Sequence, residues 1–125
     1  MSTQTLAGQK ILITGGSSGI GMAAAKLLEA KGAEVTINGR DQAKLDAAAK
    51  ELKVHAVQGD VGNEADAIRI VQEAKEAMGG LGVLVNNAGW GYIAPLLQME
   101  AEQFEAMWRT NVLGATLMAR EAAKV

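Results

Sequence analysis

The sequence predicts an α/β fold, in which a parallel sheet of four strands carries helices on both faces. Short apolar or β-branched runs alternate with longer segments of helical periodicity, and parallel strands need such helical crossovers to connect them. The chain also contains 15 glycines but one proline. Glycines follow the ends of several segments, which indicates tight turns between elements rather than a flexible linker.

The composition excludes several classes of protein. A length of 125 residues suits one domain with its own core, and a hydrophobic fraction of 49% excludes a disordered chain. The absence of cysteine rules out disulfides and thiol nucleophiles, and it favours a reducing, cytoplasmic compartment. No apolar run is long enough for a membrane span or a secretion leader. A net charge of −2 argues against a nucleic-acid surface, and no metal site is predicted.

The first half of the chain predicts three strands and two helices, after a lead-in over residues 1–9. The strands are expected at residues 10–14, 34–38 and 54–58, and the helices at residues 22–31 and 41–53. Gly32 follows the first helix, and Asp41 is the predicted N-cap of the second. The predicted sheet-facing residues are Ala24, Leu27, Leu28 and Lys31 in the first helix, and Leu45, Ala48, Ala49 and Leu52 in the second.

The second half predicts a helix at residues 63–78, a strand at residues 83–85, a loop containing Pro95, and one long helix from Glu102 onward. The buried stripe of the helix at 63–78 is expected to be Ala67, Ile68, Val71, Ala74, Lys75 and Met78, with Gly79 and Gly80 ending the helix. The last helix is apolar on two sides: Phe104, Met107, Trp108, Val112, Ala115, Met118 and Ala119 form one stripe, and Leu113 and Leu117 lie on another. A helix with two apolar faces needs two partners.

The most specific local signal is the glycine-rich turn TGGSSGIG at residues 14–21. It follows a predicted strand and opens a predicted helix, as a dinucleotide-binding turn does. Gly15 permits the tight turn, Gly19 allows close approach of a pyrophosphate, and Gly21 lets the helix pack on the sheet. The pyrophosphate would meet unpaired N–H groups at the helix N-terminus. The predicted contacts of this turn are Gly15, Ser17, Ser18, Gly19, Ile20 and Gly21, and the alternative is an ordinary strand-to-helix turn.

The spacing T-G-x-x-x-G-x-G resembles the short-chain dehydrogenase/reductase family. Three further segments match that family in the same order along the chain: Asp60-Val61, Asn86-Asn87-Ala88-Gly89 and Asn111. The resemblance covers nearly the whole sequence. It implies a Rossmann-like three-layer αβα fold with strand order 3-2-1-4. Residues 1–125 would then be a single, partial dinucleotide-binding domain that stops before a fifth strand.

The resemblance also implies roles for the residues that leave the third and fourth strands. Asp60, with Val61, would contact the adenine, and its alternative role is to cap the next turn or helix. The predicted contacts near the nicotinamide ribose are Asn87, Ala88 and Gly89. Asn86 and Asn87 are also expected to tie neighbouring strand ends together, because both lie at the carboxyl edge of the sheet.

The end of the second strand bears on which dinucleotide is bound. A carboxylate there binds the 2′-hydroxyl of NAD, but this chain has Asn38-Gly39-Arg40. Asn38 can donate a hydrogen bond and Arg40 can pair with a phosphate, so NADP(H) is favoured over NAD(H). Two features weaken that expectation: Ser18 stands where many NADP-preferring relatives carry a basic residue, and Asp41 partly offsets the charge of Arg40. Arg40 could alternatively be a solvated loop charge.

The catalytic Ser and Tyr-x-x-x-Lys residues of the family are absent from these 125 residues. Tyr92 is the single tyrosine and has Leu96 four residues on, so a loop or pocket position is expected for it. His55 is expected to be a partly exposed strand residue. Asn111 matches the family's catalytic asparagine, which holds a water in a proton relay, but its relay partner is missing. We therefore expect negligible hydride transfer by this chain, which would be a truncated gene, a fragment or a cleavage product.

Two surfaces lead us to expect self-association as a homodimer. The fourth strand would present a bare apolar edge, and the last helix has two apolar faces. Association through either or both is expected. A non-catalytic, self-associating nucleotide-binding or structural module is accordingly the alternative to an NADP(H)-dependent oxidoreductase.

Overall fold

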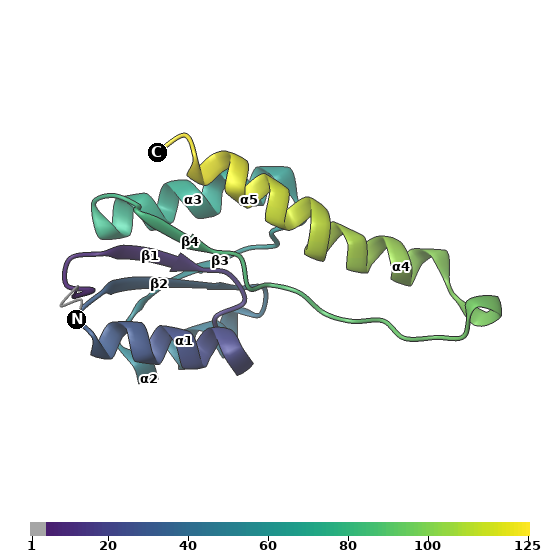
Figure 1. The fold of residues 1–125 in the computed structure, drawn as a ribbon, viewed down its shortest axis with the longest axis horizontal. Helices are drawn as coiled ribbons and strands as arrows, with labels where there is room; N and C mark the ends of the chain where they lie inside the picture. Colours follow the sequence, from purple (N-terminus) through teal and green to yellow (C-terminus); the bar gives the residue numbers. More distant parts are fainter. Residues whose placement is uncertain (1–4) are drawn as a thin grey trace.

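Four parallel strands form the sheet in the order β3-β2-β1-β4, as the family resemblance implied. The computed structural model describes residues 5–125, and the first four residues of the predicted lead-in lie outside that range. The strands are β1 (Lys10–Ile13), β2 (Glu34–Gly39), β3 (His55–Gln58) and β4 (Val83–Val85). Figure 1 shows α1 and α2 on one face of the sheet and α3 and α5 on the other. The three-layer αβα arrangement is therefore confirmed.

Three helices connect the strands: α1 (Gly19–Ala30), α2 (Gln42–Leu52) and α3 (Glu64–Met78). The predicted N-cap of α2 is confirmed, since the Asp41 carboxylate accepts from Lys44 N at 3.1 Å. Asn63 caps α3 in the same way, accepting from Asp66 N at 2.9 Å. Gly79 ends α3 at a φ of +73°, a conformation that glycine adopts without penalty.

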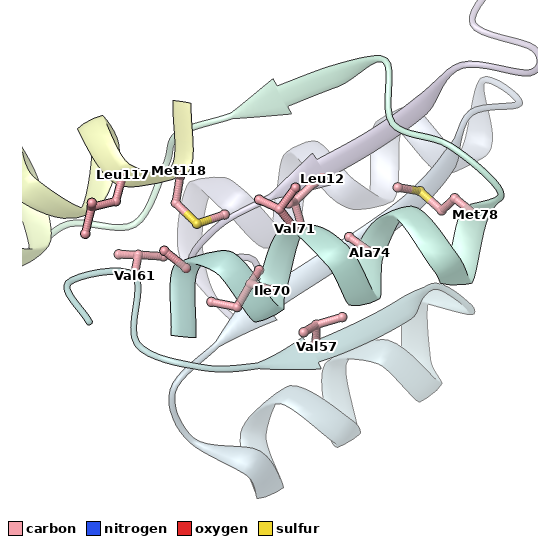
Figure 2. Packing of buried hydrophobic residues seen from close by; sticks show 10 residues of the cluster. Leu12, Val57, Val61, Ile70, Val71, Ala74, Met78, Leu117 and Met118 are labelled. Atoms are coloured by element: carbon pink, nitrogen blue, oxygen red, sulfur yellow. The ribbon is translucent and has the colours of Figure 1, made fainter. Parts of the chain in front are cut away.

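The apolar residues of the strands alternate between two cores, one on each face of the sheet. The core beneath α1 and α2 contains Ile11, Ile13, Val35 and Ile37 of the strands, with Ala25, Leu45, Ala48 and Leu52 of the helices. The opposite core contains Leu12 and Val57 with Val61, Ala67, Ile70, Val71, Ala74, Met78, Leu117 and Met118 (Figure 2). Helices of the chain itself thus cover both faces of the sheet.

Two of the predicted helix stripes contain positions that the structure exposes, although Ala67, Val71, Ala74 and Met78 of the α3 stripe are buried as expected. Leu27 of α1 is 57% exposed, because Gly21 and Ala25 face the sheet instead. The rotation of α1 follows from Gly21, where an added Cβ would lie only 2.5 Å from Gly15 O. Ile68 of α3 is 41% exposed and Ile70 is buried in its place. The predicted Lys31 and Lys75 positions are also exposed.

The predicted long C-terminal helix is a continuous helical rod in three segments. They are α4 (Ala101–Trp108), the π-helix η2 (Arg109–Gly114) and α5 (Ala115–Ala122), preceded by the short 3₁₀ helix η1 (Leu96–Gln98). Figure 1 shows α5 beside α3, whereas α4 and the loop before it extend past the sheet. Residues 91–108, the loop and α4, are called the arm below. Within residues 5–125, no helix is long and apolar enough to cross a lipid bilayer.

A charged cluster fixes α5 against α3. The Glu121 carboxylate, only 6% exposed, accepts from Arg120 Nε and Lys124 Nζ, both at 2.8 Å. Arg120 Nη1 also donates to Glu64 Oε2 at 3.0 Å, at the first residue of α3. The hydrogen bond from Lys124, helped by that from Arg120, lowers the pKa of the Glu121 carboxyl below its ordinary value of 4.5 against the opposing effect of burial.

Candidate functional site

A cavity of about 510 Å³ opens at the carboxyl ends of the strands, where ligands bind in open α/β sheets. Its lining includes all the predicted cofactor contacts except Gly21, which lies behind it: Gly15, Ser17, Ser18, Gly19, Ile20, Asn38, Arg40, Asp60, Val61, Asn87, Ala88 and Gly89. The lining also includes six residues for which no cofactor contact was predicted: Gly39, Asp41, Lys44, Gly59, Trp90 and Thr110. Segments distant in the sequence therefore meet at one edge of the sheet.

The three glycines of the turn after β1 have three different surroundings. Gly15 has a φ of +64°, and a Cβ there would lie 2.9 Å from Ala88 Cα. Gly21 is packed against Gly15 O. Gly19 has a φ of +57°, and a Cβ there would meet nothing within 4 Å. A tight turn, a close helix–sheet contact and an open backbone surface are what a dinucleotide-binding turn requires at these positions, so the turn fits a pyrophosphate.

The N-terminus of α1 differs from those of α2 and α3. Ser18 occupies the N-cap position of α1 but, within the described part of the chain, its side chain makes no capping hydrogen bond. The first turn of α1, like that of α2, also lacks an acidic residue. Asp41 and Asn63 do cap the other two helices. The positive end of the α1 dipole and its unpaired N–H groups therefore remain available to an anion in the cavity.

Thr14 and Asn87 lock the end of β1 to the end of β4. Thr14 Oγ1, almost fully buried, accepts from Asn87 N and Ala88 N, both at 3.0 Å. Asn87 Nδ2 donates to Thr14 O at 3.1 Å and to Gly15 O at 3.0 Å. The predicted tie between strand ends is confirmed for Asn87 but not for Asn86, whose Nδ2 donates to Ala115 O of α5 at 3.1 Å. Thr14 was not predicted to be its centre, although a hydroxyl at the last position of a strand is the signal that could have shown it.

Asn38 lies at the end of β2 with its side chain 1% exposed. Its Nδ2 donates to Val57 O and to Gly59 O, both at 3.1 Å. The hydrogen-bond donors that we expected to be available to a cofactor are therefore used to hold β3. At the position where a carboxylate would bind a ribose hydroxyl, this chain therefore has the uncharged side chain of Asn38.

Arg40 lies on the exposed turn after β2. Gln58 Nε2 donates to Arg40 O at 3.0 Å and so fixes the backbone of that turn. The Asp41 carboxylate caps α2 and also lines the cavity beside Arg40, so the expected partial offset of the Arg40 charge stays a prediction.

Asp60 performs the capping role that was left as an alternative. Its Oδ1 accepts from Gly62 N at 2.9 Å, and its own N–H donates to Asp66 Oδ2 at 2.9 Å. Asp60 also lines the cavity, and Oδ2 has no hydrogen-bond donor among residues 5–125. The side chain of Val61 is buried in the core, so only its backbone is available to a ligand.

Asn111 lies in the π-helical segment and holds the loop that follows β4. Its Oδ1 accepts from Trp90 N at 3.0 Å, and its Nδ2 donates to Trp90 O at 2.8 Å. Trp90 Nε1 in turn donates to Thr110 Oγ1 at 3.2 Å. Trp90 and Thr110 line the cavity whereas Asn111 does not. The structure shows a positioning role for Asn111, and its catalytic role stays a prediction.

The single tyrosine and the single histidine lie away from the cavity. Tyr92 is a loop residue whose Oη accepts from Glu100 N at 3.0 Å, at the start of α4. His55 begins β3, at the opposite end of that strand from the cavity, and is half-exposed as expected. Its Nε2 lies 2.9 Å from Glu34 Oε2.

Comparison with known proteins identifies the family. The family model described as short chain dehydrogenase matches residues 9–125. The chain belongs to the short-chain dehydrogenase family. Glucose 1-dehydrogenase of Gluconobacter oxydans is 43% identical over 124 residues, an alignment that covers 94% of this chain and 47% of that enzyme. The chain spans about half the length of the curated relatives it matches.

Solved structures confirm the fold and place dinucleotides in two similar proteins. A short chain dehydrogenase from Burkholderia cenocepacia in complex with NADP has a TM-score of 0.91 and 32% identity, covering 97% of this chain and 52% of that one. A 3-ketoacyl-(acyl-carrier-protein) reductase from Brucella melitensis complexed with NADH has a TM-score of 0.90 and 38% identity, covering 94% and 50%. Structures with this fold thus hold either dinucleotide.

Proposed function

We propose that this chain is the dinucleotide-binding part of an oxidoreductase that transfers a hydride between NADP(H) and a carbonyl or alcohol. One observation carries it: the open backbone at Gly19 and the uncapped start of α1 border the same cavity. An anion there would meet free N–H groups at the positive end of a helix dipole. Membership of the short-chain dehydrogenase family supports the assignment of that anion as a pyrophosphate.

Each end of the dinucleotide would have its own contacts in the cavity. The hydroxyls of Ser17 and Ser18 can donate to the pyrophosphate, and the free oxygen of Asp60 can accept from the adenine amine. Gly89, also in the lining, would let the backbone approach the nicotinamide ribose. These assignments use the lining residues of one cavity and require no rearrangement of β1, β2 or β4.

The preference for NADP(H) is supported by the end of β2. Asn38 places no carboxylate at the end of β2 to repel a 2′-phosphate, and the Arg40 guanidinium can pair with it as a fork. The similar protein from Burkholderia cenocepacia is in complex with NADP. We propose the same choice for this chain.

The nicotinamide would supply the hydride, whereas residues 1–125 bind and orient it. The sequence contains no Tyr-x-x-x-Lys motif, so these residues offer no general acid or base for the substrate oxygen. Asn111 would contribute by holding the backbone of Trp90 at the cavity rim. We therefore propose negligible carbonyl reduction by residues 1–125 in isolation.

Titration with NADPH, followed by its fluorescence, tests the proposal. Gly19→Ala places a methyl group in the space proposed for the pyrophosphate, and we expect it to weaken binding at least about tenfold, or ~1.4 kcal/mol. Gly8→Ala is the matched control, because Gly8 also has a positive φ (+79°) and no atom within 4 Å of a built Cβ but lies outside the cavity. Both variants carry similar backbone strain. Absence of binding by the unmodified chain at millimolar NADPH would contradict the proposal.

A further inference from the structure

Two cations border the cavity at the turn between β2 and α2. Arg40 begins the turn and Lys44 lies in the first turn of α2, and both are lining residues. Neither side chain has an ion-pair or hydrogen-bond partner in the described range 5–125, although five other basic residues of that range do form ion pairs: His55, Arg69, Arg109, Arg120 and Lys124. Within these residues no ion pair neutralises either positive charge, and Asp41 is the acidic residue that shares the cavity lining with them.

We propose that Lys44 is a second specificity-determining residue, which binds the 2′-phosphate of NADP(H) together with Arg40. Lys44 takes this role only if the proposed function is correct, since the phosphate belongs to the same bound dinucleotide. A 2′-phosphate carries close to two negative charges at neutral pH. Arg40 can bind two of its oxygens as a fork, and Lys44 adds a compact charge from the helix side.

The backbone around both cations is fixed by hydrogen bonds from three elements. The Asp41 carboxylate accepts from Lys44 N, which anchors the first turn of α2 and directs the acidic charge toward the helix terminus. On the other side, Gln58 Nε2 holds Arg40 O, and Arg69 Nη2 holds Gln58 O at 2.7 Å. The two cations therefore start from a preorganised turn, so less ordering is needed when a phosphate binds.

Lys44 also compensates for the lack of a basic residue at position 18, the feature that weakens the sequence-based expectation of NADP(H). Ser18, in the turn after β1, carries no charge, so a 2′-phosphate would have a cation on only one side if Arg40 acted alone. Lys44 comes from the following helix instead. Ser18, Arg40 and Lys44 line the same cavity. Lys44 therefore supplies, from α2, the second positive charge that is missing at Ser18.

Calorimetric titration with NADP⁺ and NAD⁺ separates this role from general cofactor binding. The variants are Lys44→Gln, Arg40→Gln and, as a control, Lys50→Gln, an exposed lysine in the last turn of α2. Lys44→Gln retains the backbone N–H that Asp41 caps, and a melting curve for each variant verifies folding. We expect Lys44→Gln to weaken NADP⁺ binding about three- to tenfold, with NAD⁺ binding changed less than about twofold. Lys50→Gln should leave both affinities unchanged.

A second variant tests the local charge in the opposite direction. Asp41→Asn keeps an N-cap acceptor but removes the negative charge beside the two cations. We expect it to tighten NADP⁺ binding about two- to threefold without changing NAD⁺ binding.

The outcomes distinguish the two levels of the assignment. If Arg40→Gln weakens NADP⁺ binding and Lys44→Gln does not, the role of Lys44 is overturned while the proposed function stands. An equal loss for both dinucleotides in Lys44→Gln would also overturn it, since that residue would then not act on the phosphate. If the unmodified chain binds neither dinucleotide, the proposed function itself fails.

Discussion

Apolar side chains are mostly buried in the sheet and its helices α1 to α3, called the packed region below. In the arm at residues 91–108 they are mostly exposed. Ile13 and Ile37 in the sheet are completely buried, whereas Ile93 and Leu97 in the arm are 98% and 97% exposed. Within α4, all of which the structure describes, no residue is buried. The cavity belongs to the packed region, and Figure 1 shows the arm leading away from it.

This difference indicates that burial in the packed region stabilises the fold, whereas the arm presents an apolar surface to other molecules. Within the arm, Glu100 N donates to Tyr92 Oη and Tyr92 N donates to Met107 Sδ, so these hydrogen bonds join the loop to α4 and leave the apolar side chains exposed. A contiguous exposed apolar surface is typical of an interaction site. We therefore expect substitutions in the packed region to affect folding and cofactor binding, and substitutions in the arm to affect association.

The largest expected effect is on the free energy of unfolding. Ile37→Ala removes a fully buried side chain from the centre of β2, so we expect a loss of about 3–4 kcal/mol. Leu97→Ala in the arm should change stability by less than about 0.5 kcal/mol. Urea unfolding followed by circular dichroism measures both. Similar losses for the two variants would show that the arm is packed as tightly as the sheet.

A smaller loss is expected from cutting the tie between β1 and β4. Thr14→Val leaves Asn87 N and Ala88 N without their acceptor in a buried position, which should cost about 2–3 kcal/mol. It should also weaken NADPH binding, because the turn after β1 starts there. The control is Thr116→Val, whose exposed hydroxyl only donates to Val112 O within the helical rod. An unchanged unfolding midpoint for Thr14→Val would contradict the role of this tie.

Much of the packed region could be predicted because its determinants are local. The glycine spacing, the Asp41 cap and the alternation of strands and helices each depend on residues close in sequence, and all three match the structure. The helix rotations could not be predicted as well. Leu27 and Ile70 differ from expectation because the rotation of a helix is set by its contacts with the sheet, which helical periodicity does not specify.

The candidate site shows the same division. The turn residues and Asn87 could be assigned from a motif, but the hydrogen bonds from the Asn38 amide to Val57 O in β3 and Gly59 O just after it depend on strand pairing. Lys44 was not recognised, since its position beside the cavity requires knowing that α2 begins at the same edge of the sheet. The π-helical segment around Asn111 also has no simple sequence signal.

Self-association is the expected property of the arm and the adjoining helical rod. Trp108→Glu places a charge on an apolar side chain that is 44% exposed, so we expect it to raise the dimer dissociation constant about tenfold or more. Leu27→Glu is the control, because Leu27 is a similarly exposed apolar residue on the packed region. Multi-angle light scattering over a range of concentrations measures the effect. A stable monomer at micromolar concentration for the unmodified chain would contradict the expectation.

The smallest expected effect is a pH dependence at the junction of α5 with α3. Because ion pairing lowers the pKa of Glu121 in the folded chain, the native state binds fewer protons there than the unfolded state. The resulting stability is fully present above pH 4.5 and is lost as the pH falls through the lowered pKa. Glu121→Gln should therefore be less stable at pH 7, with the difference shrinking below pH 4.5. Glu51→Gln, at an exposed position on α2, should show no such trend.

Hydrogen exchange of the backbone amides, with and without NADP⁺, tests most directly whether the packed region alone forms the dinucleotide site. The first amides of α1 lack protein partners for their N–H groups and should exchange quickly in the free chain. With saturating NADP⁺, we predict slower exchange in residues 15–21 and in residues 39–44, and unchanged exchange in the arm. Protection confined to the arm, or no protection at millimolar NADP⁺, would contradict the account.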